Sequence, residues 1–130
     1  MHVRTLVVDD SEYMRRMLVM MLRKISIDDI VQASSGEEAL KILAAGQIDL
    51  VLLDCVMPKD DGFQVLKAIR ANPKIANLPV SLLTGHADEG IVAKARAPDT
   101  RADGIIAKPL SLATLQAKVG SVLANCGRSL

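Results

Sequence analysis

The stretch IDLVLLD, residues 48–54, is the most apolar strand-like run of the chain, and it ends in an acid. The stretch LVVDD, residues 6–10, ends in the same way, with Asp9 and Asp10 side by side. A short and nearly continuous run of branched apolar residues is typical of a strand that is buried on both faces. Both stretches therefore predict interior strands of a parallel sheet that finish in carboxylates.

On either side of these two stretches, short apolar runs alternate with segments of helical spacing. The predicted strands span residues 3–8, 29–33, 48–54, 78–85 and 104–109. N-cap candidates mark the starts of four predicted helices, namely Ser11, Ser35, Asp88 and Ser111. Residues 56–62 are expected to form a loop because of their proline and their Asp-Gly pair. Five strands that alternate with five helices predict an α/β fold in which helices cover both faces of a parallel sheet.

The composition predicts a single domain that spans residues 1–130. The net charge is +1 and no basic tract stands out, which excludes an electrostatic footprint for nucleic acid or for an anionic membrane. The longest unbroken apolar run, residues 17–22, is far too short to cross a bilayer. The N-terminus lacks the apolar segment of a signal peptide. A cytoplasmic location is therefore expected.

Five polar residues follow four of the predicted strands. They are Asp9, Asp10, Asp54, Thr84 and Lys108. Because right-handed crossovers bring the carboxyl ends of parallel strands to one edge, we expect these side chains to meet there. Three neighbouring carboxylates disfavour being ionised together, and a hard divalent cation would remove that conflict. Oxygen ligands without histidine or cysteine point to Mg²⁺.

This edge also has the composition of a phosphoryl site. Lys108 supplies a compact positive charge and Thr84 supplies a hydroxyl group. Together with a magnesium ion, these groups stabilise the charge that develops during phosphoryl transfer. Asp54 is the predicted nucleophile, because it lies centrally between the acidic pair and the lysine.

At this constellation the sequence closely resembles the receiver domain of two-component response regulators. The matching segments are LVVDDS, LVLLDCVMPKDDG, LLTGHA and ADGIIAKP, in the family's order and spacing. The segment DDSEYMRR is particularly similar to the first helix of single-domain chemotaxis-type regulators. The resemblance covers essentially the whole chain. It implies a flavodoxin-like, five-stranded parallel sheet in the order 2-1-3-4-5.

The resemblance also implies the roles of the site residues. Asp54 would accept a phosphoryl group from a histidine kinase or a phosphotransfer protein. Asp9, Asp10 and Asp54 would hold Mg²⁺ together with the backbone carbonyl of Val56, and Lys108 would contact the phosphoryl oxygens. Thr84 would move toward them, so that the surface of helix 4, strand 5 and helix 5 signals to an unknown partner protein. The Lys108–Pro109 bond is expected to be cis.

Two features depart from the family pattern. Ile105 and Leu110 occupy positions where the family commonly has aromatic residues, of which the first moves inward together with the threonine. Either an aliphatic side chain substitutes at position 105, or the signal leaves by the neighbouring loop and helix. Residues 98–103 form a connection that is about two residues longer than usual, which changes a surface on which many receivers bind partners.

Several neighbouring residues receive more specific interpretations. Val56 and His86 flank the approach to Asp54, and we expect this pair to tune how fast water removes the phosphoryl group. Cys55 should point away from the site, because strand residues alternate faces. By family analogy, the kinase-docking surface is the first helix, with Tyr13, Arg15, Arg16 and Met17 near the rim.

Two rival functions fit these residues less well. A phosphatase of the haloacid-dehalogenase type also uses an aspartate nucleophile and Mg²⁺, but it needs a second acid two residues after the nucleophile, where this chain has Val56. A receiver-like interaction domain that is not phosphorylated generally lacks one of the acids or the lysine, and this chain retains them all. The prediction is thus a phosphoacceptor signalling domain that catalyses only its own phosphorylation and dephosphorylation.

Overall fold

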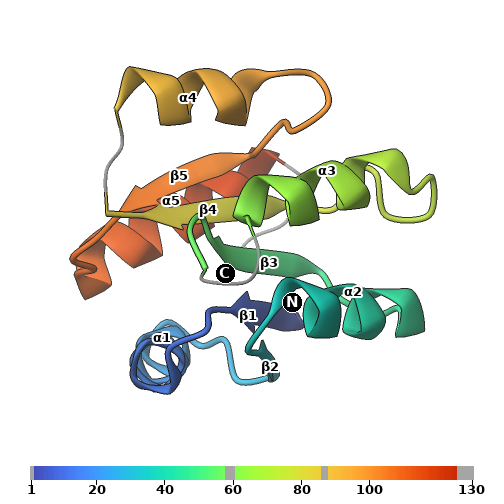
Figure 1. The fold of residues 1–130 in the computed structure, drawn as a ribbon. Coiled ribbons are helices and arrows are strands. Elements are labelled where there is room, and N and C mark those ends of the chain that lie inside the picture. Colours follow the sequence, from blue (N-terminus) through green and yellow to red (C-terminus); the bar gives the residue numbers. More distant parts are fainter. Residues whose placement is uncertain (1, 58–60, 86–87, 126–130) are drawn as a thin grey trace.

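The computed structural model describes residues 2–57, 61–85 and 88–125. Its centre is one parallel sheet of five strands in the order β2-β1-β3-β4-β5, as the resemblance implied (Figure 1). The strands are β1 (Thr5–Val8), β2 (Ile30–Ala33), β3 (Leu50–Asp54), β4 (Val80–Thr84) and β5 (Gly104–Ala107). They are one to three residues shorter than the apolar runs that predicted them.

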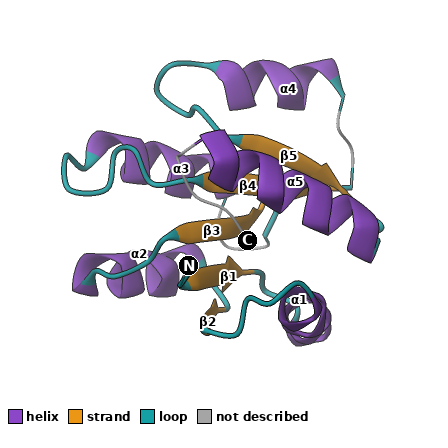
Figure 2. Cartoon of the chain, turned by 180° about the vertical axis from the view of Figure 1, so that it is seen from behind, coloured by secondary structure: helices purple, strands orange, loops and turns teal. Residues whose placement is uncertain are grey.

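Helices cover both faces of the sheet. They are α1 (Glu12–Lys24), α2 (Gly36–Ala45), α3 (Gly62–Ala71), α4 (Glu89–Arg96) and α5 (Leu112–Asn125). Helices α1 and α5 pack on one face, which is nearer the viewer in Figure 2, and α2, α3 and α4 pack on the other. The three-layer α/β fold is therefore confirmed. Among the described residues, no helix is long and apolar enough to cross a membrane.

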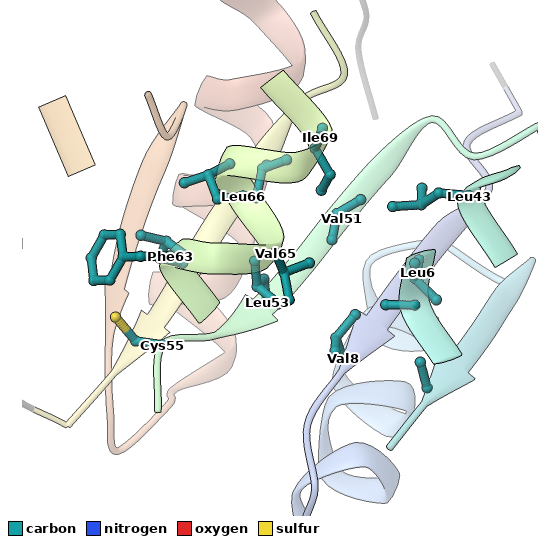
Figure 3. Close-up of a cluster of buried hydrophobic side chains, with 14 of the residues drawn as sticks. Leu6, Val8, Leu43, Val51, Leu53, Cys55, Phe63, Val65, Leu66 and Ile69 are labelled. Atoms are coloured by element: carbon teal, nitrogen blue, oxygen red, sulfur yellow. The ribbon is translucent and has the colours of Figure 1, made fainter. Parts of the chain in front are cut away.

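Each face of the sheet has its own apolar core. On the α2/α3 side, alternate residues of the central strands, such as Leu6, Val51 and Leu53, form one apolar cluster with side chains of α2 and α3, among them Leu43 and Leu66 (Figure 3). The opposite residues of the same strands pack against α1 and α5. Because β1, β3 and β4 are buried on both faces, their polar residues can reach solvent only at the strand ends.

The predicted helix caps are confirmed. The side chains of Ser11, Ser35, Asp88 and Ser111 each accept a hydrogen bond from a backbone N–H in the first turn of the following helix. A fifth cap was missed: the Asp61 carboxylate accepts from the Phe63 N–H at 2.9 Å. The Asp-Gly pair at 61–62 was expected to be part of a loop, but it begins α3 instead.

A buried arginine ties the end of α3 to two loops. The Arg70 side chain is 5 % exposed, and its Nη2 lies 2.9 Å from a carboxylate oxygen of Asp103. Arg70 also donates to the carbonyls of Ala76, Leu78 and Arg101. Asp103 in turn accepts from the N–H of Val80, at the start of β4. These contacts fix the connection at 98–103 against α3.

The start of α3 rests directly on the end of β3. The Gly62 N–H donates to the carbonyl oxygen of Cys55 at 3.0 Å. A Cβ atom on Gly62 would lie 2.4 Å from the carbonyl oxygen of Asp54, which is closer than real Cβ contacts. Gly62 is therefore required by the close approach of the two backbones. This contact sets the position of α3 relative to Asp54.

We predict that Gly62→Ala lowers the free energy of unfolding by about 1–3 kcal/mol, because the new methyl group must displace backbone. The matched control is Gly90→Ala in α4, where the nearest atom to the added Cβ is 3.4 Å away. The control should be neutral or slightly stabilising, since alanine favours helix. Urea denaturation measures both. Equal stability of the two variants would contradict the close approach.

Candidate metal and phosphoryl site

Three carboxylates from two strand ends meet at one edge of the sheet. Asp9 and Asp10 follow β1 directly, and Asp54 is the last residue of β3. One oxygen atom from each of the three lies within 4.8 Å of the others. Asp9 is 1 % exposed and Asp54 is 6 % exposed, whereas Asp10 is open to solvent. The parallel topology thus gathers the acids as the sequence predicted.

Two contacts brace the turn that carries Asp9. Its Oδ1 accepts a hydrogen bond from the Ser11 N–H at 2.9 Å, and its carbonyl oxygen accepts from Arg15 Nη1 at 2.7 Å. Arg15 Nε in addition donates to the side chain of Gln32 on β2. Arg15 was expected to face a kinase, so this structural role was missed. The polar Gln32 within an apolar strand was the one available signal.

Lys108 provides the positive charge of the site. Its Nζ lies 3.2 Å from Asp54 Oδ1 and 3.7 Å from Asp9 Oδ2. The Lys108 N–H donates to the carbonyl oxygen of Thr84 at 2.8 Å, which joins the ends of β4 and β5. The side chain of Thr84 is buried at this edge. The Lys108–Pro109 peptide bond is cis, as expected.

The fold opposes the negative charge of Asp9. Burial raises the pKa of this carboxyl, and the neighbouring charges of Asp54 and Asp10 raise it further. The hydrogen bond from Ser11 and the charge of Lys108 lower the pKa but do not cancel the rise. At Asp9, burial and the neighbouring carboxylates thus outweigh the Ser11 hydrogen bond and the charge of Lys108.

The residues fit a hard divalent cation. Asp9 Oδ2 is buried and has no hydrogen-bond partner among the described residues, although its charge needs one. The ligand set of Asp9, Asp10 and Asp54 offers carboxylate oxygens alone, which suits Mg²⁺ better than a metal that prefers nitrogen or sulfur. The nearest positive group to this oxygen, Lys108 Nζ, lies 3.7 Å away, beyond hydrogen-bond distance. A cation bound here would coordinate the oxygen directly and offset the repulsion.

Cys55, next to Asp54, takes no part in the site. Its side chain is buried in the α2/α3-side core near Phe63 (Figure 3). Burial, together with the charges of Asp61 and Asp54, raises the pKa of the thiol to about 11. The thiol therefore stays protonated at neutral pH and is a poor nucleophile. The expectation that Cys55 points away from the carboxylates is confirmed.

The remaining predicted site residues lie around this cluster. Val56 is 74 % exposed, and its N–H lies 3.4 Å from Asp54 Oδ1. Ile105, on β5, is half-buried and packs against the α2/α3-side core. Leu110 packs instead against the core formed with α1 and α5. His86 lies outside the described residues.

Comparisons with known proteins agree with this geometry. The family model for the response regulator receiver domain matches residues 5–120. The chain is similar to the chemotaxis protein CheY-3 of Vibrio cholerae, with 35 % identity over 122 residues, which are 93 % of this chain and 92 % of the relative.

Solved structures show the same likeness. Chemotaxis response regulator CheY4 of Vibrio cholerae superposes with a TM-score of 0.86 at 28 % identity, covering 95 % of this chain and 100 % of that chain. The receiver domain of a signal transduction histidine kinase from Syntrophus aciditrophicus superposes with a TM-score of 0.84 at 26 % identity, covering 98 % of this chain and 95 % of that chain.

We predict that Asp9→Asn raises the free energy of unfolding of the metal-free protein at pH 7 by about 1 kcal/mol, because it removes a buried charge that the fold opposes. The pKa of Asp9 is higher in the folded than in the unfolded state, so the wild type loses stability as the pH rises above 3.8, the ordinary pKa of an aspartate. The difference between the two proteins should therefore grow from acidic to neutral pH. Urea denaturation with a chelator present measures it.

Magnesium should reverse this order. At about 10 mM Mg²⁺ the wild type should gain stability by mass action, whereas Asp9→Asn should gain little. Equal stabilisation of both proteins by Mg²⁺, or a variant that is less stable without metal at every pH, would contradict the predicted site.

Proposed function

The chain belongs to the family of response regulator receiver domains, and we propose that it accepts a phosphoryl group on Asp54 from a histidine kinase or a histidine phosphotransfer protein. The observation that carries the proposal is the Asp54 carboxylate itself, which lies within 4.8 Å of two further acids and 3.2 Å from Lys108 Nζ. We propose that the receiver domain comprises residues 1–130 and works in the cytoplasm.

In the proposed reaction, a carboxylate oxygen of Asp54 attacks the phosphorus atom of a phosphohistidine. The new O–P bond forms as the P–N bond breaks, and the imidazole leaves with the electron pair and takes up a proton. Lys108 stabilises the negative charge of the phosphoryl oxygens. Because the Lys108 ammonium already contacts Asp54, it needs little rearrangement to do so. Hydrolysis of the acyl phosphate returns the carboxylate.

The acidic cluster would hold Mg²⁺ through Asp9, Asp10, Asp54 and, by the family pattern, the backbone carbonyl of Val56. The ion would neutralise charge that otherwise repels an incoming phosphoryl group. Asp9 Oδ2, which accepts no hydrogen bond from the described residues, and the raised pKa of that carboxyl support this assignment. Asp9 and Asp10 therefore position the cation, and Asp54 is both ligand and nucleophile.

The output would travel from Thr84 to the surface formed by α4, β5 and α5. A backbone hydrogen bond joins Lys108 to Thr84. A movement of the end of β4 would therefore displace the end of β5 as well. Ile105, opposite Leu82 in the sheet, packs against the same core as Ala95 of α4. We infer that the aliphatic side chain of Ile105 takes the place of the family's aromatic residue in this core.

The phosphodonor would approach over the start of α1. Tyr13 is 63 % exposed there, and Arg16 is also exposed. Arg15 is occupied by the Asp9 carbonyl, so it contributes less to docking than the sequence suggested. The haloacid-dehalogenase alternative gains no support, because the required acid is replaced by Val56 and the family match is to receiver domains.

The central prediction concerns Asp54→Asn. The wild type, incubated with Mg²⁺ and radiolabelled acetyl phosphate, should take up about one phosphoryl group per chain. Asp54→Asn should incorporate at least about 100-fold less label, because the nucleophile is gone. The matched control is Asp61→Asn, which alters a nearby acid but keeps its helix cap. Equal labelling of Asp54→Asn and the wild type would overturn the proposal.

A second prediction concerns the lifetime of the phosphorylated state. Val56→Asn should shorten it by about three- to tenfold, a barrier change of at most about 1.4 kcal/mol, because an amide beside Asp54 can orient the attacking water. His86→Glu should also change the lifetime if the pair acts as proposed. Loss of label after removal of the donor measures both. An unchanged lifetime in both variants would contradict this role.

A further inference from the structure

A hollow lies between α3 and α4, away from the acidic site, with a cavity volume of about 290 Å³. Its lining includes Phe63 and Lys67 from α3, Lys94 from α4, and Ala97, Asp99 and Thr100 from the segment that follows α4. We call this hollow the α3–α4 cleft. The connection at 98–103 therefore builds one of its walls.

The floor of the α3–α4 cleft is aromatic. Phe63 is 7 % exposed, so its ring is fixed in the core and presents its remaining surface to the cleft. Lys94 Nζ lies 5.5 Å from the centre of this ring, in a cation–π contact. A lysine held over a ring by so weak a contact can exchange it for a better partner. The floor therefore places a small apolar surface beside a positive charge.

The loop wall of the cleft is already in place. The Thr100 hydroxyl donates to the carbonyl of Lys94, and the Ala102 N–H donates to the carbonyl of Ala95 at 2.8 Å. Arg70 holds the next residue of the loop through the Arg101 carbonyl at 2.7 Å. A ligand would therefore meet a preformed surface and would lose little affinity to ordering it.

The charge of the cleft favours an acidic ligand. Two lysines line the cleft, Lys67 from α3 and Lys94 from α4, and Asp99 is the one acid among the described residues of its lining. Lys67 and Asp99 form an ion pair of 3.8 Å in which the side chains are 66 % and 61 % exposed. Such an exposed pair contributes little, so a ligand carboxylate can replace Asp99 as the partner of Lys67.

Two other hollows among the described residues have the opposite character. One is lined by Glu37 and Asp61, between α2 and α3, and its lining contains no basic side chain. The other, at the start of β1, contains Asp28 and Asp29 together with His2. The positive charge of the α3–α4 cleft is therefore not a general property of this surface.

We propose that the α3–α4 cleft is a docking site for an acidic segment of a partner protein that inserts one large apolar side chain against Phe63. The volume suits a single side chain, and the two lysines would bind carboxylates on either side of it. Nucleic acid is a poorer fit, since two lysines beside an acid make no basic track. This docking goes beyond the proposed function and does not require phosphorylation of Asp54.

The test uses the full chain, labelled with ¹⁵N, and the peptide acetyl-Asp-Glu-Phe-Glu-Asp-amide. We expect saturable shifts of the amides of Phe63, Lys94 and Thr100, with a dissociation constant of about 0.1–1 mM. A peptide with lysine in place of each acid, and one with glycine in place of the phenylalanine, should each bind at least about tenfold more weakly.

Three variants test the contacts. Lys67→Glu combined with Lys94→Glu should weaken binding at least about tenfold. Lys118→Glu, an exposed lysine of α5 outside the cleft, should change it less than about twofold. Asp99→Asn should instead tighten binding by about two- to fivefold, because it removes the acid that competes for Lys67. A gain of affinity cannot be caused by misfolding.

The proposal is overturned by any of three results. The first is the absence of a saturable shift up to about 5 mM peptide, which is well above the expected dissociation constant. The second is a set of shifts centred on another surface. The third is equal weakening by Lys118→Glu and by the double variant. None of these outcomes would affect the phosphorylation of Asp54, so the two proposals can fail separately.

Discussion

The repulsion among three carboxylates at the end of β1 and β3 is the constraint on which the rest of the site depends. Asp9 and Asp54 are almost fully buried, and Asp10 lies beside them. Among the described residues, Lys108 is the one ammonium group in contact with the pair. The pKa of Asp9 is nevertheless raised, first by burial and then by the charges of Asp54 and Asp10. A second cation is therefore the natural complement. A site that needs added positive charge is also one that can accept a phosphoryl group once that charge is supplied.

The apolar sheet makes this arrangement tolerable. The strands that end in the acids are buried on both faces, between one core shared with α2, α3 and α4 and another shared with α1 and α5. The free energy gained by burying the apolar side chains of both cores outweighs the cost of a few unfavourable charges. Rigid anchors then hold the carboxylates: Arg15 braces the carbonyl of Asp9, and the start of α3 lies against Asp54 through Gly62. The unfavourable free energy at the site therefore comes from charge repulsion and burial, whereas the backbone around it is held in place by hydrogen bonds and close packing.

The sequence predicted the sheet, its layers and four helix caps, because each of these follows from local periodicity or from one capping residue. The meeting of Asp9, Asp54 and Lys108 was predictable as well, since parallel topology places strand ends together. The roles of Arg15 and Arg70 were not predictable. Both bind backbone carbonyls, some far away in the chain, and such bonds leave no pattern in the residues they join. The role of Asp61 was misread because an Asp-Gly pair serves equally in a turn and at a helix start.

The packing of α4 bears on how a receiver with Ile105 can switch. Within α4, all of which the structure describes, Ala95 is the one fully buried residue, so this helix is held to the sheet by little apolar surface. A small buried area means a low free-energy cost of displacement. Ile105 is half-buried and packs in the same core as Ala95, and an isoleucine cannot swing a large ring between two sites. If Asp54 is phosphorylated as proposed, the change of shape must therefore come from a shift of α4 and its connections rather than from rotation of an aromatic side chain.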